Sequence, residues 1–155
     1  MNNRVRGANW KLLLAGAGSL GISLLHFVIP MLGPGAFGYF GAAELMPAVR
    51  AGSLLPAVLT WALAALFALF GTYAWSGAGL IRRLPGLRPA LAFIALVYAL
   101  RGLALFPESA QLLQGALSPP RRVVFSAVSL ALGLLYAAGL AALRRRRQLG
   151  NAPPD

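Results

Sequence analysis

The chain has 155 residues, of which 59% are hydrophobic and 11% charged, and it carries a net charge of +11. Soluble domains carry about 25% charged residues, so this composition excludes a water-soluble globular domain and predicts a surface that faces lipid. Because cysteine is absent, disulfides, thiolate metal sites and cysteine catalysis are excluded. The basic residues lie between apolar segments, which favours membrane topology and anionic lipid headgroups over nucleic acid as their explanation.

Two apolar segments occupy the first half of the chain. Residues 11–32 follow a basic start and form a run of about twenty apolar residues, enough to cross a hydrocarbon core of about 30 Å. A run of this length predicts a retained signal-anchor helix rather than a cleaved signal. After a Gly/Pro-rich connection over 33–53, a second span is expected over 54–76, with Ser53 as its cap and Pro56 in its first turn.

Two further spans are expected in the second half. A basic loop leads to the third span, residues 89–106. Residues 107–115 are too short and too polar to cross a membrane, and they predict a short helix in the interface plane. Ser118 and Pro119 are typical of an N-cap followed by a first-turn proline, so the fourth span is predicted over 119–143. Residues 144–155 are expected to form a basic cytoplasmic tail.

These segments predict an all-α membrane protein, a four-transmembrane-helix antiparallel bundle in a single domain over 1–155. Strands are excluded because the apolar runs lack period two and open sheet edges are not tolerated in lipid. An even number of spans places both termini on one side. Ten of the fourteen basic residues flank that side, so both termini are expected in the cytoplasm of a bacterium with this protein in its inner membrane.

Small residues recur along every predicted span, as in Ala15-Ser19-Ser23 of the first and Ser129-Gly133-Ala137 of the fourth. In lipid, helices associate through such residues because they allow close backbone approach. The stripes therefore predict a compact bundle, and they serve a homodimer equally well. A homodimer, a larger membrane-protein partner and membrane lipids are the partners left open.

The stretch from His26 to Gly52 contains most of the unusual residues. His26 lies in the outer third of the first span, where it either bonds a neighbouring carbonyl or handles protons or a ligand.

Arg101 lies about 7–8 Å below the end of the third span. Its side chain is expected to meet Glu44 rather than to snorkel, with Glu108 as the other acid on that face.

The residues between the first two spans predict a cap on the outer end of the bundle. The cap is either a plug or a lid over a small pocket. The predicted ligand-binding residues are His26, Tyr39, Glu44, Tyr98 and Arg101. The predicted lipid-headgroup residues are Arg82, Arg83, Arg144, Arg145, Arg146 and Arg147.

Residues for catalysis or metal binding are scarce. The sequence has no GxSxG, no HExxH and no phosphate-binding loop, so no catalytic residue is assigned. A single histidine is a poor zinc site, because zinc takes three or four protein ligands. We therefore predict no metal and no cofactor, and consider an enzyme the less favoured interpretation.

The segment Tyr39-Phe40-Gly41-Ala42, which follows the region of His26 and Pro34, carries a family resemblance. The chain resembles small uncharacterised four-span bacterial membrane proteins with a YFGA-type segment between their first two spans. More loosely, it is similar to the DoxX-like architecture of four short spans with a Gly-rich first helix. This resemblance implies a four-span fold and a redox or accessory role, and it assigns no functional residue.

Three functions remain open on the sequence alone. The first is a non-enzymatic inner-membrane protein that binds a lipid or small amphipathic ligand, or acts as an accessory subunit, through its periplasmic end. The second is a small transporter or proton-coupled channel. The third is a membrane enzyme on a lipid or isoprenoid, with His26 as acid/base and Glu44 as its partner.

Overall fold

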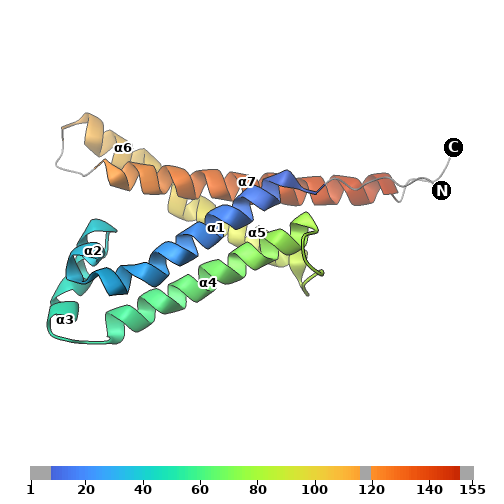
Figure 1. Cartoon of the computed structure of the whole chain (residues 1–155). Helices are drawn as coiled ribbons and strands as arrows, with labels where there is room; N and C mark the ends of the chain where they lie inside the picture. The colour runs from blue at the N-terminus through green and yellow to red at the C-terminus, as the bar shows by residue number, and fades with distance from the viewer. Residues whose placement is uncertain (1–7, 116–119, 151–155) are drawn as a thin grey trace. The chain divides into compact units, whose positions relative to one another are not determined.

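The structure is a computed structural model that describes residues 8–115 and 120–150 (Figure 1). All regular structure in these residues is helical, which confirms the all-α fold class. The elements are α1 (Trp10–Val28), η1 (Ile29–Leu32), α2 (Pro34–Tyr39), η2 (Ala43–Leu45), α3 (Met46–Arg50), α4 (Leu55–Ala78), α5 (Leu87–Gly102), α6 (Leu105–Leu113) and α7 (Arg121–Gly150).

Four helical stretches are long and apolar enough to cross a membrane, as the sequence predicts. They are Trp10–Leu32, Leu55–Ala78, Leu87–Leu113 and Arg121–Arg145. The chain divides into two compact units, and each is described by itself. Unit 1 comprises Met1–Gly16 and Thr72–Asp155, and unit 2 comprises Ala17–Gly71.

In unit 1, the four long helices meet around the first turn of α1. The Asn9 side chain is buried and donates a hydrogen bond from Nδ2 to the Gly139 carbonyl of α7, at 2.8 Å. A Cβ placed on Gly77 of α4 would lie 2.7 Å from Leu12 of α1, and it would also contact Leu91 of α5 and Leu143 of α7. The start of α1, the end of α4, the start of α5 and the last third of α7 therefore share one end of this unit.

The α5–α7 pair is the most extensive helix contact of unit 1, and its helices are antiparallel. Gly102 lies against the backbone of Leu130, and Gly133 lies against the backbone at Ala95 and Ala99. A Cβ on Gly102 would lie 2.6 Å from the Leu130 Cα, and one on Gly133 would lie 2.8 Å from the Ala99 nitrogen. The helices thus approach at the small residues, as expected where lipid supplies no hydrophobic drive to associate.

Two helix ends in unit 1 differ from the ends of the predicted spans. α5 ends at Gly102 and α6 begins at Leu105, although both belong to the apolar stretch Leu87–Leu113. α7 continues to Gly150, beyond the predicted end of the span at 143, and its apolar stretch ends at Arg145. Arginine, glutamine and leucine are good helix formers, and the first strong helix breaker after Leu143 is Gly150 itself. The short helix predicted between the third and fourth spans is present as α6.

In unit 2, α1 and α4 also run antiparallel. Ser23 Oγ donates to the Ala64 carbonyl at 2.7 Å, and Trp61 Nε1 donates to the Phe27 carbonyl at 3.1 Å. The predicted cap of α4 is confirmed, since Ser53 Oγ accepts a hydrogen bond from the Leu55 amide at 3.3 Å. These bonds join α1 and α4 within unit 2.

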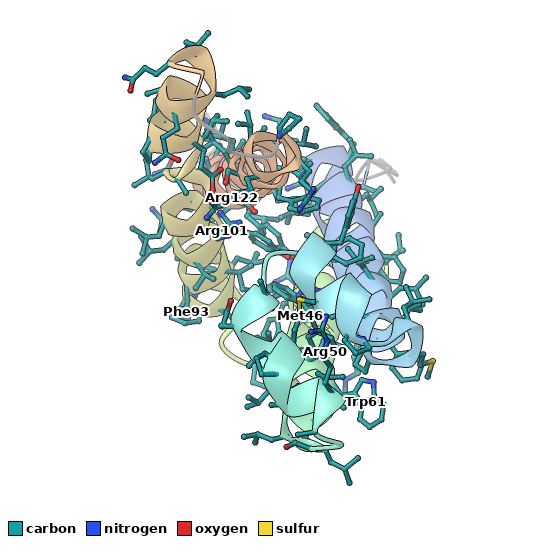
Figure 2. All side chains as sticks on the ribbon, turned by 90° about the vertical axis from the view of Figure 1, so that its left-hand side faces the viewer. Met46, Arg50, Trp61, Phe93, Arg101 and Arg122 are labelled. Atoms are coloured by element: carbon teal, nitrogen blue, oxygen red, sulfur yellow. The ribbon has the colours of Figure 1, made fainter. Side chains whose placement is uncertain are left out.

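The Gly/Pro-rich connection in unit 2 is largely helical. Its turns are η1, α2, η2 and α3, and Figure 2 shows Met46 and Arg50 on α3. Pro47 lies in the first turn of α3. Proline is well placed there, since the first-turn amide has no partner inside the helix.

Several sequence predictions lie outside the described residues. They concern the basic start of the chain up to residue 7, the Ser118-Pro119 cap, the start of the fourth span at 119, and the part of the tail over 151–155. The side chains of Arg146 and Arg147 also lie outside the described part of the structure.

Candidate functional site

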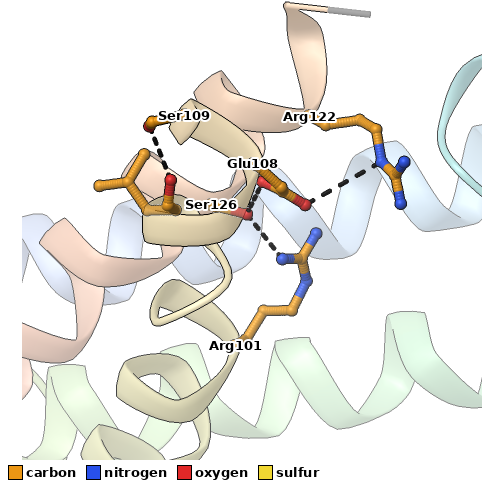
Figure 3. Close-up of polar contacts among 6 residues, drawn as sticks. Arg101, Glu108, Ser109, Arg122 and Ser126 are labelled. Carbon is orange, nitrogen blue, oxygen red and sulfur yellow. Dashed lines mark hydrogen bonds and ion pairs between the residues drawn. The ribbon is translucent and has the colours of Figure 1, made fainter. Parts of the chain in front are cut away.

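The strongest polar cluster in unit 1 is centred on Ser126, whose side chain is fully buried. Arg101 Nη1 donates a hydrogen bond to Ser126 Oγ at 2.8 Å, and Ser126 Oγ donates to Glu108 Oε2 at 2.6 Å (Figure 3). The serine hydroxyl therefore accepts a hydrogen bond from a cationic side chain and donates one to an anionic side chain. This geometry links the last turn of α5, the first turns of α6 and the second turn of α7.

Glu108 receives a second contact from α7. Arg122 Nε lies 4.0 Å from Glu108 Oε1, and the Arg122 side chain is 55% exposed while that of Glu108 is 11% exposed. Figures 2 and 3 show the Arg101 and Arg122 side chains directed to the same region between α5 and α7. We refer to Arg101, Glu108, Arg122 and Ser126 as the arginine cluster.

The local sequence accounts for this placement. Arg122 and Ser126 are four residues apart on α7 and hence lie on one face. The chain bends after Gly102 and restarts as α6, with Glu108 in its first turn. The Ser109 hydroxyl donates a hydrogen bond to the Leu105 carbonyl of its own helix at 2.6 Å. The contact of α6 with Ser126 of α7 is therefore made by the neighbouring Glu108.

The charges of the arginine cluster do not cancel. Arg122 lies beside the Glu108 carboxylate and Arg101 is joined to it through Ser126, so two cations and one anion give the cluster a formal charge of +1. Each guanidinium has five N–H donors, and one on each faces the cluster. Arg101 and Arg122 are both exposed as whole residues. The cluster can therefore offer forked donors to an external carboxylate or phosphate.

The predicted residue Arg101 belongs to this cluster, and it is joined to Glu108 through Ser126. The expected contact with Glu44 pairs residues of different units and stays a prediction. Tyr98, also predicted as a ligand-binding residue, is 3% exposed and stacks on Tyr136 with ring centroids 5.7 Å apart. Within unit 1, Tyr98 thus packs in the α5–α7 contact.

His26 has the local bond expected of an interfacial histidine. Its Nδ1 donates to the Ile22 carbonyl at 2.8 Å, because a carbonyl oxygen can only accept. The ring packs against Phe67 with centroids 4.9 Å apart. His26 as an acid or base stays a prediction.

Tyr39 and Glu44 occupy the short helices of unit 2. The Tyr39 ring meets the Phe40 ring edge-on at 5.0 Å, and Glu44 is exposed in the η2 turn. Phe37 of the same helix as Tyr39 is 2% exposed. The lid and plug interpretations of residues 33–53 both stay predictions.

Unit 2 also carries an apolar groove of about 550 Å³ between α1 and α4. The lining residues are Leu20, Ser23, Leu24, Phe27, Trp61, Ala64, Ala65 and Ala68. The alanines form a shallow floor because their side chains are small, and the Ser23 hydroxyl is already bonded to the Ala64 carbonyl. The groove therefore offers shape and apolar contact, and its polar side chains, Ser23 and Trp61, are both bonded to backbone carbonyls.

The predicted headgroup residues that the structure describes are exposed. Arg82 and Arg83 lie in the loop between α4 and α5, and Arg144 and Arg145 lie on the last turns of α7. The sequence prediction missed Ser126 and Arg122 as site residues. Their four-residue spacing was a usable signal, but nothing in the sequence indicated which serine of the fourth span faces the third.

Within residues 8–115 and 120–150, no group of three histidine, cysteine, aspartate or glutamate side chains is placed to hold a metal ion. Comparisons with protein-family models, with curated proteins and with solved structures found no match to this chain.

Proposed function

We propose that the chain is a multi-pass membrane protein that binds the anionic group of an amphipathic molecule at the arginine cluster. The supporting observation is the 2.6 Å bond from the buried Ser126 hydroxyl to Glu108, which joins Arg101 to the carboxylate that Arg122 of α7 approaches at 4.0 Å. A fixed excess of forked donors in an apolar setting favours a carboxylate or phosphate ligand.

The surface beside the cluster favours an amphipathic ligand over a free anion. Large apolar side chains are exposed on the same helices, namely Leu100, Leu103, Phe106, Val124 and Val128. A ligand tail can lie along this surface while its headgroup meets Arg101 and Arg122. Arginine is also better suited than lysine to such a site, since its fork matches both oxygens of the anion.

The topology of the proposal follows the distribution of charge. Lys11, Arg82, Arg83 and Arg88 belong to the end of unit 1 where the four long helices meet, whereas the arginine cluster lies at the opposite end of the α5–α7 pair. The positive-inside rule then assigns the basic end to the cytoplasm and the arginine cluster to the outer leaflet. The inner membrane of a bacterium and a DoxX-like accessory role are parts of this proposal.

The test is native mass spectrometry of protein released from nanodiscs that contain phosphatidylcholine and phosphatidylglycerol. We expect phosphatidylglycerol adducts on the wild type and about tenfold weaker retention in Arg101→Gln, because a lost interaction of 1.4 kcal/mol is a factor of ten in affinity. Arg50→Gln, an exposed arginine of unit 2, is the charge-matched control and should keep the adducts.

Glu108→Gln separates ligand binding from a purely structural role. This change raises the formal charge of the cluster from +1 to +2, so an anion site should retain phosphatidylglycerol more strongly. Equal adduct levels in wild type, Arg101→Gln and Glu108→Gln, with all three folded, would refute the proposal and leave the cluster as a clamp between α6 and α7.

A further inference from the structure

The basic end of unit 1 is a second charged surface, and the arginine cluster does not account for it. We define the basic end by its described cationic residues, which are Lys11, Arg82, Arg83, Arg88, Arg144 and Arg145. They come from α1, the α4–α5 loop, α5 and α7. The contacts of Leu12 with Gly77 and Gly139 bring these elements together at one end.

No described carboxylate of unit 1 neutralises this end. The chain has three acidic residues, and the one described in unit 1 is Glu108, which is bonded to Ser126 at the far end of the α5–α7 pair. Like charges gathered without a counterion repel one another, at a cost that falls when an external anion lies between them. The basic end is therefore a surface that gains from an anionic partner.

The α4–α5 loop is held in a fixed conformation that presents its arginines. Ser76 is 2% exposed, and its Oγ donates to the Arg82 carbonyl at 3.0 Å and accepts from the Leu84 amide at 2.9 Å. Tyr73 donates from its hydroxyl to the Pro85 carbonyl at 3.2 Å. Since the backbone is bonded on both sides of Arg83, the exposed guanidinium groups start from an ordered base.

The tip of the same loop is apolar and exposed. Leu80 is 55% exposed and Ile81 is 41% exposed, directly before Arg82 and Arg83. Trp10 is 59% exposed at the start of α1, and Lys11 Nζ lies 5.9 Å from the centre of its ring. Exposed aliphatic and tryptophan side chains beside cations are typical of the membrane interface. Binding of a soluble polyanion would not require the exposed aliphatic side chains at the tip of the loop.

We propose that the basic end is a docking surface for the anionic phospholipids of the leaflet around it. Leu80 and Ile81 insert below the headgroups, and the arginines of the loop and of α7 bind the phosphates above them. The partner is the phospholipid phosphate itself, and the ordered loop makes Arg82 and Arg83 its principal contacts. This surface is separate from the arginine cluster, and it would exist whether or not that cluster binds a ligand.

Tryptophan fluorescence can report lipid binding at the basic end. Trp10 begins α1, and the Trp75 carbonyl accepts the Leu80 amide at 3.0 Å, so both indoles belong to the basic end. Trp61 belongs to unit 2 and is removed by Trp61→Phe. In that background, fluorescence quenching by brominated phosphatidylglycerol is compared with quenching by brominated phosphatidylcholine, with the full chain in vesicles.

We expect the Trp61→Phe protein to prefer phosphatidylglycerol, and each arginine removed from the loop to weaken that preference about fivefold. Arg82→Gln/Arg83→Gln should therefore weaken it about 25-fold, and the preference should fall with added salt. Arg50→Gln is the control and should retain the preference, as should Arg101→Gln, which tests the arginine cluster separately.

Two outcomes would overturn the proposal. One is an unchanged preference in folded Arg82→Gln/Arg83→Gln, with folding checked by circular dichroism. The other is release of brominated phosphatidylglycerol by a single-stranded RNA oligonucleotide at physiological salt, which would assign the surface to a soluble polyanion. Leu80→Ser/Ile81→Ser is a further variant, and it should weaken quenching by both lipids because the loop tip no longer inserts.

Discussion

The α5–α7 pair of unit 1 and the α1–α4 pair of unit 2 are both antiparallel helix pairs, but their contacts differ in kind. In the first, Gly102 and Gly133 lie against the partner backbone, and the tyrosines 98 and 136 stack. In the second, a serine hydroxyl and an indole N–H each reach a partner carbonyl, and an apolar groove of about 550 Å³ remains.

The difference shows two ways to join helices in an apolar solvent. Glycines against backbone bring the two helix axes close and leave little room for lipid, so dispersion contacts dominate. The second pair relies on isolated polar bonds and larger side chains, which hold the helices at a distance where small residues line a groove. We therefore expect substitutions in the α5–α7 pair to cost more stability than comparable substitutions in the α1–α4 pair.

The largest effect is expected for Glu108→Ala. This change removes the acceptor of the Ser126 hydroxyl and the counterion of Arg101 and Arg122, so two cations remain without a carboxylate. We expect a loss of about 2–3 kcal/mol in the free energy of unfolding, the value of a hydrogen bond to a charged group. Unfolding by sodium dodecyl sulfate in mixed micelles, followed by circular dichroism, measures it.

Glu44→Ala is the matched control for Glu108→Ala, because Glu44 is exposed in the η2 turn. Its effect should stay within about 0.5 kcal/mol, as for most surface substitutions. Equal losses in the two variants would show that burial and the Ser126 bond do not stabilise unit 1.

The next effect is expected for Gly133→Ala. The new Cβ would lie 2.8 Å from the Ala99 nitrogen and 3.2 Å from the Ala95 carbonyl oxygen, and backbone atoms cannot move aside as a flexible side chain can. Overpacking of this kind should cost about 2 kcal/mol. Gly21→Ala is the control, since a Cβ there meets nothing within 4 Å and gains helix propensity. A stability at least equal to wild type in Gly133→Ala would contradict the close approach of α5 and α7.

A smaller effect is expected for Ser126→Ala, at about 1 kcal/mol. The alanine leaves Glu108 with Arg122 nearby and lets Arg101 turn toward solvent, so only the buried hydroxyl link is lost. Ser129→Ala removes a hydroxyl that bonds the Phe125 carbonyl of its own helix at 2.9 Å, and it should change stability less. If the two serine variants lose the same free energy of unfolding, the inter-helix hydrogen bonds of Ser126 do not contribute to stability.

The four apolar helices could be predicted from the sequence because length and hydropathy alone determine which segments can cross a membrane. The position at which α5 ends could not be predicted from the sequence. The apolar pattern continues from Leu100 to Phe106, and the bend after Gly102 arises where Gly102 meets Leu130 of another helix. α7 continues beyond the predicted end of the fourth span, because arginine propagates a helix well.

The candidate site was predictable only in part. Arg101 was identified because a charge inside an apolar span is costly and must be satisfied, and Glu108 was one of its two possible acids. Ser126 was not identified, since serine is common in membrane spans. Its role depends on facing α5 and α6, which the sequence does not indicate. Tyr98 was placed in a ligand pocket because it shares a face with Arg101, but that face packs on Tyr136.

The smallest effect is expected for Ser23→Ala in unit 2. The Ser23 hydroxyl bonds the Ala64 carbonyl, but that carbonyl lies inside α4, where the helix itself supplies a donor. Inter-helix hydrogen bonds in membranes contribute about 0.6 kcal/mol on average, so we expect a loss of that size in the same micelle titration. Thr60→Val is the control, because its hydroxyl bonds the Pro56 carbonyl of its own helix at 2.7 Å. A loss as large as that of Glu108→Ala would mean that Ser23 is as important to α1–α4 as the buried carboxylate is to α5–α7, and the proposed difference between the two helix pairs would then fail.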